Sequence, residues 1–458
     1  MAKKFIEEST LSAIGNSIRA KTGKTYKIPT LNMPAEIASI QTGDLPIPVS
    51  SNDVTFYDYD GTVVASYSLE EAQALTSLPD GPTHNGLTFQ GWNWSLEVIK
   101  TMYRAVNVGA IYTTDDGKTR IYITLGEGRT SPLLGCCPNG TVIVDWGDGT
   151  TPDTLTGTST STIQYTPTHN YTSPGNYMIS LTVNGTCGFL GSSATNDCHL
   201  LKYSTTADKR NRYYQNAITK IEFGDGVTSI GQYAFQNFNS LTSLIISNSV
   251  TSIGGYAFDI CYSLTSLTIP DSVTSIGDNI FQNCYSLTSL IIPDGVTSIG
   301  LSAFSGCYSL TSFIIPDSVI SIKDNVFDSC YSLTSLTIPD SVASIGSYLF
   351  GSCYSLTSLI IPNSVTSIGI SAFSGCYSLT SLIIPDSVTN IKECAFNNCY
   401  GMAEYHLKPT TPPTLSNTNA FTGIPSDCII YVPQGSLGAY QAATNWATYA
   451  SYMQEETT

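Results

Sequence analysis

A 23-residue repeat fills the second half of this chain and limits what the chain can fold into. A phenylalanine returns at that interval eight times, and an isoleucine stands five residues before each one. A unit this short cannot bury its own apolar side chains, so a strict period in the twenties indicates a solenoid whose coils cover one another. The sequence therefore predicts a rod over residues 217–408, in which eight coils stacked about 4.8 Å apart would reach roughly 40 Å. The phenylalanines are Phe235, Phe258, Phe281, Phe304, Phe327, Phe350, Phe373 and Phe396.

Each coil is expected to begin with a short strand, taken from the repeated stretch C-Y-S-L-T-S-L-T-I-P-D-S-V. In one representative coil Leu264, Leu267 and Ile269 would face inward. Pro270 and Asp271 would end the strand, because proline lacks the N–H that a continuing ladder needs and Pro-Asp favours a turn. The other inward positions of this coil would be Val273, Ile276, Phe281 and Cys284.

These repeats resemble the BspA-like class of leucine-rich repeats, which is found in bacterial surface antigens and in phage and prophage proteins. The resemblance implies a right-handed leucine-rich-repeat solenoid within a mainly β chain. The tail resembles the segment that closes such arrays, so residues 409–458 are expected to form a C-terminal cap. Its aromatic residues Tyr440, Trp446 and Tyr449 would cover the last coil.

The cysteines follow the repeat, which argues against a disulfide framework. Seven of the thirteen recur once per coil, as small apolar residues stacked in a core would. The chain has no CxxC pair with zinc-like spacing. Outside the repeat, either Cys187 with Cys198 or the vicinal Cys136 and Cys137 could oxidise, and the sequence does not decide between thiols and disulfides. The ladder consists of Cys261, Cys284, Cys307, Cys330, Cys353, Cys376 and Cys399.

Charge and composition exclude several classes of partner. The formal net charge is −16, only 12% of residues are charged, and Lys and Arg nowhere form a stripe, so nucleic acid is not an expected partner. The start of the sequence lacks the apolar stretch of a secretory signal, and no segment approaches the roughly 18 apolar residues of a membrane span. A β-rich protein of this composition is expected outside the cell, which suggests assembly into a phage particle released by lysis.

Residues 135–216 contain a second recognisable pattern. The stretch VDWGDGT starts at Val144, and His169-x-Tyr171 follows before Ser-Pro-Gly. Together they resemble a polycystic-kidney-disease (PKD) domain, a small immunoglobulin-like sandwich. Calcium bound by Asp145 and Asp148 is one possibility, but we expect these carboxylates to bond turn amides instead. No other cofactor or metal is predicted.

Residues 44–134 open with a motif that resembles the nucleophile of haloacid-dehalogenase phosphatases, Asp58-x-Asp60-Gly-Thr. Lys100 and the acidic pair Asp115-Asp116 would have to complete such a site. The segment between them shows at most two helical stretches and no series of buried parallel strands. Residues 78–94 instead resemble the internalin B-repeat, which implies that Asp58-Tyr-Asp-Gly is a hairpin turn in a small β domain.

Residues 1–43 show two short helical patterns, each too short to be stable alone. They resemble a module at the start of many tail-associated proteins of Gram-positive phages, which implies docking on other tail or baseplate proteins or on sister copies. A homo-oligomer such as a trimer is therefore expected. The alternative is a helical hairpin that packs on the domain that follows it. The apolar stripe consists of Leu11, Ile14, Ile18, Met33, Ile37 and Ile40.

The outer face of the solenoid strands is the candidate binding surface. If Leu267 and Ile269 point inward, then Ser266, Thr268 and Pro270 point outward. The Thr268 column is mostly isoleucine, which indicates either an interaction surface or β-branched residues chosen for strand propensity on a face that another domain or copy covers. This column is Ile245, Thr268, Ile291, Ile314, Thr337, Ile360 and Ile383.

Two further columns flank this face. A tyrosine column beside the cysteines suits sugar stacking or, alternatively, packing along the rod, and an aspartate column makes one edge acidic. The tyrosines are Tyr262, Tyr285, Tyr308, Tyr331, Tyr354, Tyr377 and Tyr400, and the aspartates are Asp271, Asp294, Asp317, Asp340 and Asp386.

Catalysis has little support, because the four histidines are scattered and none is paired with a nucleophile. We therefore expect a non-enzymatic virion protein, assembled in the host cytoplasm, that serves as a phage tail fibre or tail-tip adhesin. The N-terminal helices would attach it, the two β domains would form a stalk, and the solenoid would bind a bacterial surface glycan or protein. The alternatives are a bacterial cell-surface or secreted adhesin and a capsid decoration fibre.

Overall fold

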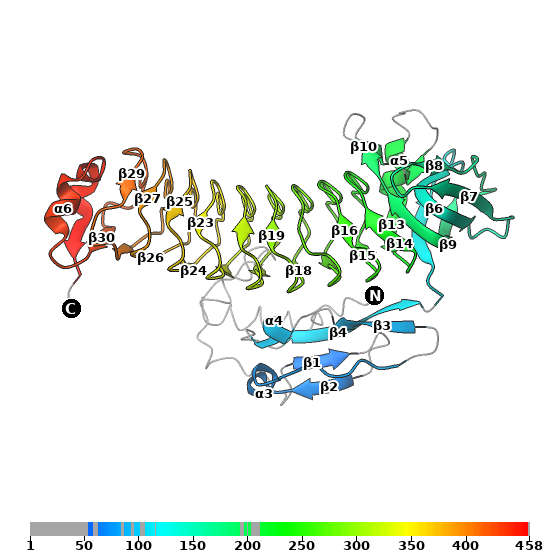
Figure 1. Cartoon of the computed structure of the whole chain (residues 1–458), viewed down its shortest axis with the longest axis horizontal. Helices are drawn as coiled ribbons and strands as arrows, with labels where there is room; N and C mark the ends of the chain where they lie inside the picture. Colours follow the sequence, from blue (N-terminus) through cyan, green and yellow to red (C-terminus); the bar gives the residue numbers. More distant parts are fainter. Residues whose placement is uncertain are drawn as a thin grey trace, which may run out of the picture.

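The computed structural model shows a mainly β chain with few helices, as predicted (Figure 1). The helices expected within residues 1–43, with the attachment stripe from Leu11 to Ile40, lie outside the described residues. The structure describes residues 54–57, 63–83, 87–92, 96–100, 106–114, 116–192, 197–198, 200–202 and 211–456.

A four-stranded sheet of order β2-β1-β4-β3 comes first. Strand β1 pairs antiparallel with β2 and parallel with β4. Its small core includes Phe56 packed edge-on against Trp92, with ring centroids 4.9 Å apart. Two five-residue helices accompany the sheet, within the expected limit. The elements are β1 (Val54–Tyr57), β2 (Val63–Tyr67), α3 (Leu69–Gln73), β3 (Leu87–Trp92), α4 (Leu96–Lys100) and β4 (Val106–Thr114).

The two strands that flank the Asp58 motif pair antiparallel, as the predicted hairpin requires, and residues 58–62 themselves lie outside the described residues. Val54 lies opposite Tyr67 and Phe56 opposite Ala65, so the chain returns directly from β1 to β2. A dehalogenase-type site needs a helical crossover to a parallel strand after its nucleophile. The next described strand, β2, runs antiparallel to β1 instead.

A ten-stranded sheet joins the middle of the chain to the solenoid. Strand β9 pairs antiparallel with β5 and β6 over most of its length, and its last residues, Cys187 to Phe189, pair parallel with β14 of the first coil. Strand β13 likewise pairs antiparallel with β5 and parallel with β15. The bounds are β5 (Thr119–Leu125), β6 (Leu133–Asp145), β7 (Asp153–Thr158), β8 (Gln164–Tyr165), β9 (Gly175–Phe189), β12 (Leu201–Lys202), β13 (Ile218–Glu222), β14 (Val227–Ile230), β15 (Ser243–Ile245) and β16 (Ser252–Ile253).

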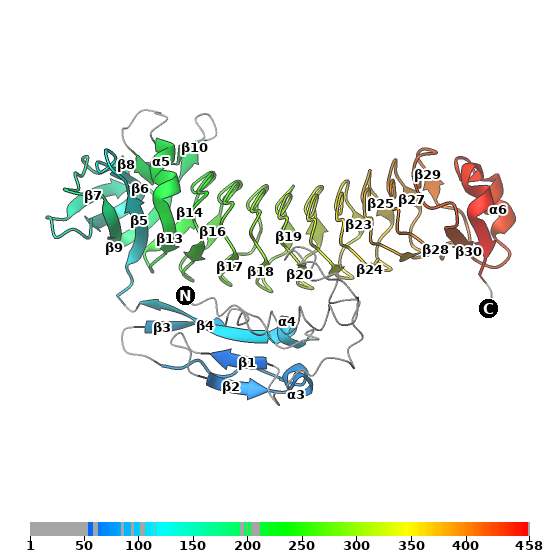
Figure 2. The ribbon, with the colours of Figure 1, turned by 180° about the vertical axis from the view of Figure 1, so that it is seen from behind.

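This continuity differs from the expected separation of residues 44–134, 135–216 and 217–408. Strand β5 lies in the first of these ranges but pairs with β9 of the second. One apolar core also runs without a break from Ile121 to Met453. The sheet of β5, β6 and β9 therefore covers the first coil and acts as an N-terminal cap rather than as a separate stalk domain (Figures 1 and 2).

The solenoid has about 10 turns of roughly 23 residues between residues 220 and 455. Its coils stack in register, with Leu267 opposite Leu290 and Thr268 opposite Ile291. The predicted inward residues of the representative coil are confirmed, since all seven are buried. The strands of the candidate binding face are β17 (Ser266–Thr268), β18 (Ser289–Ile291), β20 (Ser312–Ile314), β22 (Ser335–Thr337), β24 (Ser358–Ile360), β26 (Ser381–Ile384), β28 (Glu404–Leu407) and β30 (Ile429–Val432).

A second row of two-residue strands lies on the other side of the coils. The first five contribute the isoleucine that precedes the phenylalanine by five positions, such as the buried Ile322 and Ile345, and the last contributes Leu415. These strands are β19 (Ser298–Ile299), β21 (Ser321–Ile322), β23 (Ser344–Ile345), β25 (Ser367–Ile368), β27 (Asn390–Ile391) and β29 (Thr414–Leu415).

The predicted aromatic cover of the last coil is confirmed, but β29 and β30 still continue the coil stack, so the cap follows residue 432 and does not begin at residue 409 as expected. Tyr440, Trp446 and Tyr449 are buried, and Trp446 and Tyr449 pack against Phe421 with ring centroids 5.5 and 5.3 Å away. The Trp446 indole donates to the Pro413 carbonyl at 2.6 Å. The cap comprises α6 (Leu437–Ala442), the 3-10 helix Trp446–Tyr452 and β31 (Met453–Glu455).

Each coil turns the corner around its phenylalanine with two residues of positive φ. Around Phe281 these are Asn279 and Asn283, both at φ 58°. Asparagine and glycine tolerate this region, whereas a β-branched side chain is strained there. Ile260 occupies the second of these positions in its coil, at φ 63°.

We expect Ile260→Asn to stabilise the protein by about 1 kcal/mol, because it relieves a left-handed β-branched residue. The other coils supply the internal precedent, since Asn237, Asn283 and Asn398 hold the same position. Urea unfolding would measure the gain. A matched change at Ile320, which is exposed and not in this φ region, should leave stability within about 0.5 kcal/mol. An unchanged or lower midpoint for Ile260→Asn would contradict this account.

Serine side chains tie successive coils together. Ser318 Oγ donates to the Val296 carbonyl at 2.7 Å, and Ser364 and Ser387 make the same bond to the valine 22 residues earlier. Gly295 occupies this position in its coil, so the bond is missing there. A Cβ at Gly295 would meet only the Asp271 carbonyl oxygen, at 3.9 Å, and its φ is not in the left-handed region.

We expect Gly295→Ser to stabilise the solenoid by about 1 kcal/mol, through one added hydrogen bond and a less flexible unfolded chain. Gly295→Ala separates the two causes, because it restricts the unfolded chain but adds no hydroxyl. In chemical denaturation, the free energy of unfolding of Gly295→Ala should lie between that of the unaltered protein and that of Gly295→Ser. A serine variant no more stable than the alanine variant would remove the hydrogen bond from this explanation.

Candidate functional site

The isoleucine column lies on the strand face of the coils, as the alternation predicted. Ile245, Thr268, Ile291 and Ile314 are half-buried and Thr337 is exposed. Exposure is greatest towards the C-terminal end, where it reaches 77% at Ile360 and 54% at Ile383. The register continues the column to the polar and aromatic side chains His406 and Tyr431.

The expectation that Pro270 points outward is wrong. Pro270 and its equivalents, such as Pro293 and Pro385, are buried. The strand ends at Thr268, so strict alternation no longer applies two residues later. The Pro270 carbonyl instead accepts the Val273 amide at 3.0 Å and closes the turn.

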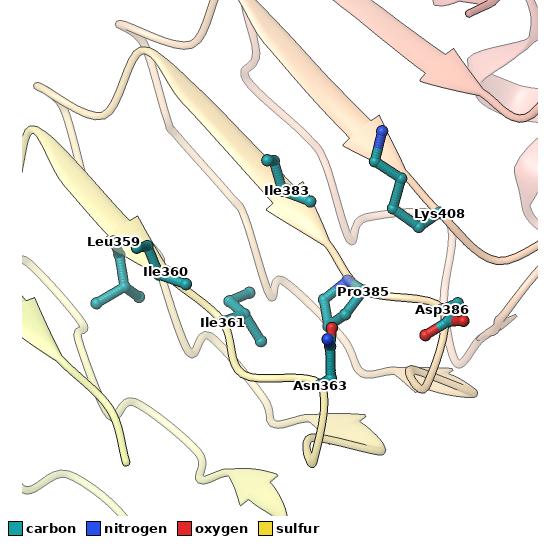
Figure 3. Close-up of a pocket in the computed structure, with 8 residues that line it drawn as sticks. All are labelled: Leu359, Ile360, Ile361, Asn363, Ile383, Pro385, Asp386 and Lys408. Atoms are coloured by element: carbon teal, nitrogen blue, oxygen red, sulfur yellow. The ribbon is translucent and has the colours of Figure 1, made fainter. Parts of the chain in front are cut away.

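A groove of about 410 Å³ opens at the exposed end of the column (Figure 3). Its apolar lining comes from β24 and β26 and from the residues that follow them. Asn363, Asp386 and Lys408 add polar groups from three successive coils. The apolar lining residues are Leu359, Ile360, Ile361, Ile383 and Pro385.

Carboxylates face the basic side chains Lys408 and His406 beside this groove. Lys408 Nζ lies 2.6 Å from Glu456 Oε1, and His406 Nδ1 lies 2.9 Å from the same oxygen. His406 Nε2 lies 3.4 Å from Glu404. Hydrogen bonds from Lys408 and then His406 hold the pKa of Glu456 below its usual range. No local sequence pattern reports this cluster, because Lys408 and Glu456 are 48 residues apart. The 23-residue spacing from Ile383 to His406 is the one sequence signal that points to it.

The tyrosine column forms a continuous stack along the rod. Successive rings from Tyr262 to Tyr400 lie face to face, with neighbouring centroids 4.4–5.3 Å apart. Burial and neighbouring tyrosines raise the pKa of Tyr285 to about 12. Each inner ring is thus covered on both faces by its neighbouring rings. A sugar could stack on an inner ring only if two neighbouring tyrosines moved apart.

The cysteine ladder is a column of buried free thiols, as predicted. Each thiol donates to a phenylalanine carbonyl 26 residues earlier, for example Cys330 to Phe304 at 3.3 Å. Burial raises the pKa of Cys353 well above its usual value, which disfavours the reactive thiolate. Cys136, Cys137 and Cys187 are also free thiols, and the side chain of Cys198 lies outside the described residues.

Asp145 and Asp148 bond turn groups. Asp145 accepts the Gly147 amide at 3.0 Å, and Asp148 Oδ1 accepts the Thr150 amide and hydroxyl at 3.1 and 2.6 Å. Asp148 Oδ2 lies 2.8 Å from the His169 ring, which stacks on Trp146. Over the described residues, no group of three or more His, Cys, Asp or Glu could hold a metal ion.

We expect Asp148→Asn to lower stability at neutral pH but to have little effect in acid. Burial alone would raise the pKa of this carboxyl, but the bonds from Thr150 and His169 outweigh burial and lower the pKa. A carboxyl with a depressed folded pKa stabilises the protein above its unfolded pKa of about 3.9 and loses that contribution as pH falls through the folded value. The gap in melting temperature between the two proteins should therefore narrow from about pH 7 to about pH 2. A difference in melting temperature that stays the same at every pH would contradict a stabilising role for the ionised Asp148 carboxylate.

Within the part of the chain that the structure describes, no helix is long and apolar enough to cross a membrane. The described histidines, His169 and His406, both face carboxylates. The other two, His84 and His199, lie outside the described residues.

Comparison with known proteins identifies the repeats. The profile of the BspA type leucine-rich repeat region matches in six copies over residues 208–334, 274–403 and 321–426. A comparison with curated proteins found no match.

Solved structures of leucine-rich repeat proteins also match. The protein from T. pallidum is 29% identical, with 35% of this chain and 81% of that chain covered and a TM-score of 0.33. A leucine-rich cell surface protein from Faecalibacterium prausnitzii is 22% identical (61% and 97% covered, TM-score 0.28). A protein from Bacteroides ovatus is 19% identical (60% and 100% covered, TM-score 0.30). On the match to the repeat profile, residues 208–426 of this chain are a BspA type leucine-rich repeat region.

Proposed function

We propose that this protein is a non-enzymatic adhesin whose solenoid binds a bacterial host surface through its strand face. The observation that carries the proposal is the exposure of Ile360 and Ile383 beside a groove. Exposed apolar side chains gathered at one place on a regular scaffold are typical of an interaction surface. The rigid stack of coils fixes their spacing before binding, which lowers the entropic cost of association.

We further propose that the adhesin is a phage tail fibre or tail-tip protein, attached through its N-terminal segment to other tail or baseplate proteins. The resemblance of residues 1–43 to a phage tail module supports this. The thiol ladder supports it too, because unpaired buried cysteines suit folding in a reducing host cytoplasm. A bacterial surface adhesin and a capsid decoration fibre are the competing assignments.

Purified phage particles test the assignment directly. Particles from the phage or induced prophage that encodes this chain should contain the protein by mass spectrometry, and gold-labelled antibody should mark the tail in electron micrographs. Label on the capsid would favour the decoration fibre. Absence from the particle, with the protein found on the bacterial surface, would favour the bacterial adhesin.

A further inference from the structure

We infer that the groove at Ile360 and Ile383 binds a protein segment that presents an aliphatic side chain next to Lys or Arg. This inference deepens the proposed function by choosing protein rather than glycan as the ligand.

The lining of the groove favours an aliphatic side chain over a sugar. Sugar rings in proteins commonly stack on aromatic faces, and no aromatic side chain lines this groove. His406 and Tyr431, which continue the isoleucine column, stack on each other with ring centroids 5.0 Å apart. The rings from Tyr262 to Tyr400 likewise use their faces for their own stacking. The lining is instead branched aliphatic, and the two isoleucines at its mouth are the most exposed isoleucines of the column. An aliphatic side chain placed between them would remove apolar surface from water on both sides of the contact.

The charges around the groove favour a basic partner. Asp386 stands exposed on the lip, and Glu404 and Glu456 lie beside it. Lys408 and His406 both face Glu456, so these two basic side chains of the described residues beside the groove already have carboxylate partners. The surroundings are therefore acidic overall, which would attract Lys or Arg on a ligand. A second copy of this chain is a poor occupant, because two molecules of net charge −16 repel each other.

Defined peptides test this inference. The probe is acetyl-GKIKIKG-amide, and its matched partners are acetyl-GKSKSKG-amide, which lacks the aliphatic side chains, and acetyl-GEIEIEG-amide, which reverses the charge. Calorimetric titration of the full chain should detect the first peptide, and the other two should bind at least about tenfold more weakly.

Substitutions locate the binding. Ile383→Ser and Ile360→Ser should each weaken binding of the first peptide about tenfold, and Asp386→Asn should weaken it less and reduce its dependence on salt. Ile320→Ser is the matched control, since Ile320 is a 65% exposed isoleucine that lies outside the groove lining, and it should change nothing. Equal affinity for the three peptides, no detectable binding, or an equal loss with Ile320→Ser would overturn the inference.

The inference and the proposed function can fail separately. If the peptide does not bind, but substitutions along Ile245 to Thr337 still abolish attachment to host cells, the groove assignment is wrong and the adhesin proposal stands. If the peptide binds at the groove but attachment is insensitive to the whole column, the groove is a site for some other protein and the adhesin proposal is wrong.

Discussion

Replacing Phe327 by alanine is expected to destabilise the solenoid by about 3–5 kcal/mol, the usual cost of removing a fully buried aromatic side chain. The ring is completely buried between Phe304 and Phe350, with centroids 5.8 and 5.9 Å away, and touches Phe313 at 5.0 Å. In a stack where each coil contacts only its neighbours, a defect at the centre weakens two interfaces at once. Urea unfolding followed by circular dichroism should show a lower midpoint and a broadened or divided transition.

The control for this experiment is Ile320→Ala in the same coil. That side chain is 65% exposed, so its removal should change stability by less than about 0.5 kcal/mol. If Phe327→Ala and Ile320→Ala had similar midpoints, the continuous phenylalanine core would not be what holds the coils together.

Replacing Trp446 by alanine is expected to cost about 3–5 kcal/mol, concentrated at the C-terminal end. The substitution removes a buried indole, its hydrogen bond to the Pro413 carbonyl, and the cover over Phe421. Terminal coils depend on their caps, because their outer face would otherwise expose core. Hydrogen exchange should show lost protection in β26, β28 and β30, whereas β17 and β18 should keep theirs.

Gln441→Ala on the exposed side of α6 is the matched control, and it should leave the protection pattern unchanged. If Trp446→Ala lost hydrogen-exchange protection equally along the whole rod, the cap would not act only on the C-terminal coils. That result would indicate that the solenoid unfolds as one cooperative unit.

The repeat made most of the fold predictable, because every coil restates the same pattern of buried residues. Leu267, Phe281 and Cys284 were assigned to the core from their spacing, and all three are buried. Two features of the fold were not predicted correctly from the sequence. The inward–outward alternation of side chains predicts that Pro270 points outward, but the strand ends at Thr268 and Pro270 is buried. The pairing of β5 with β9 and β13 joins segments far apart in the chain, and no local pattern reports such long-range pairing.

The candidate site was predictable only in part. The column from Ile245 to Ile383 follows from strand alternation. Its uneven exposure does not, since every coil has nearly the same sequence there and only the stacked structure shows which isoleucines remain open. The pairing of Lys408 with Glu456 depends on how the C-terminal cap meets the last coils. That geometry lies outside the repeat.

The most direct test of the central claim, that the strand face binds the host surface, is attachment of fluorescently labelled protein to host cells by flow cytometry. The combined variant Ile291→Ser, Ile314→Ser, Ile360→Ser and Ile383→Ser should lose attachment at least about tenfold while it stays folded by circular dichroism. Ile320→Ser should attach like the unaltered protein. Full attachment by the combined variant, or an equal loss with Ile320→Ser, would contradict the account.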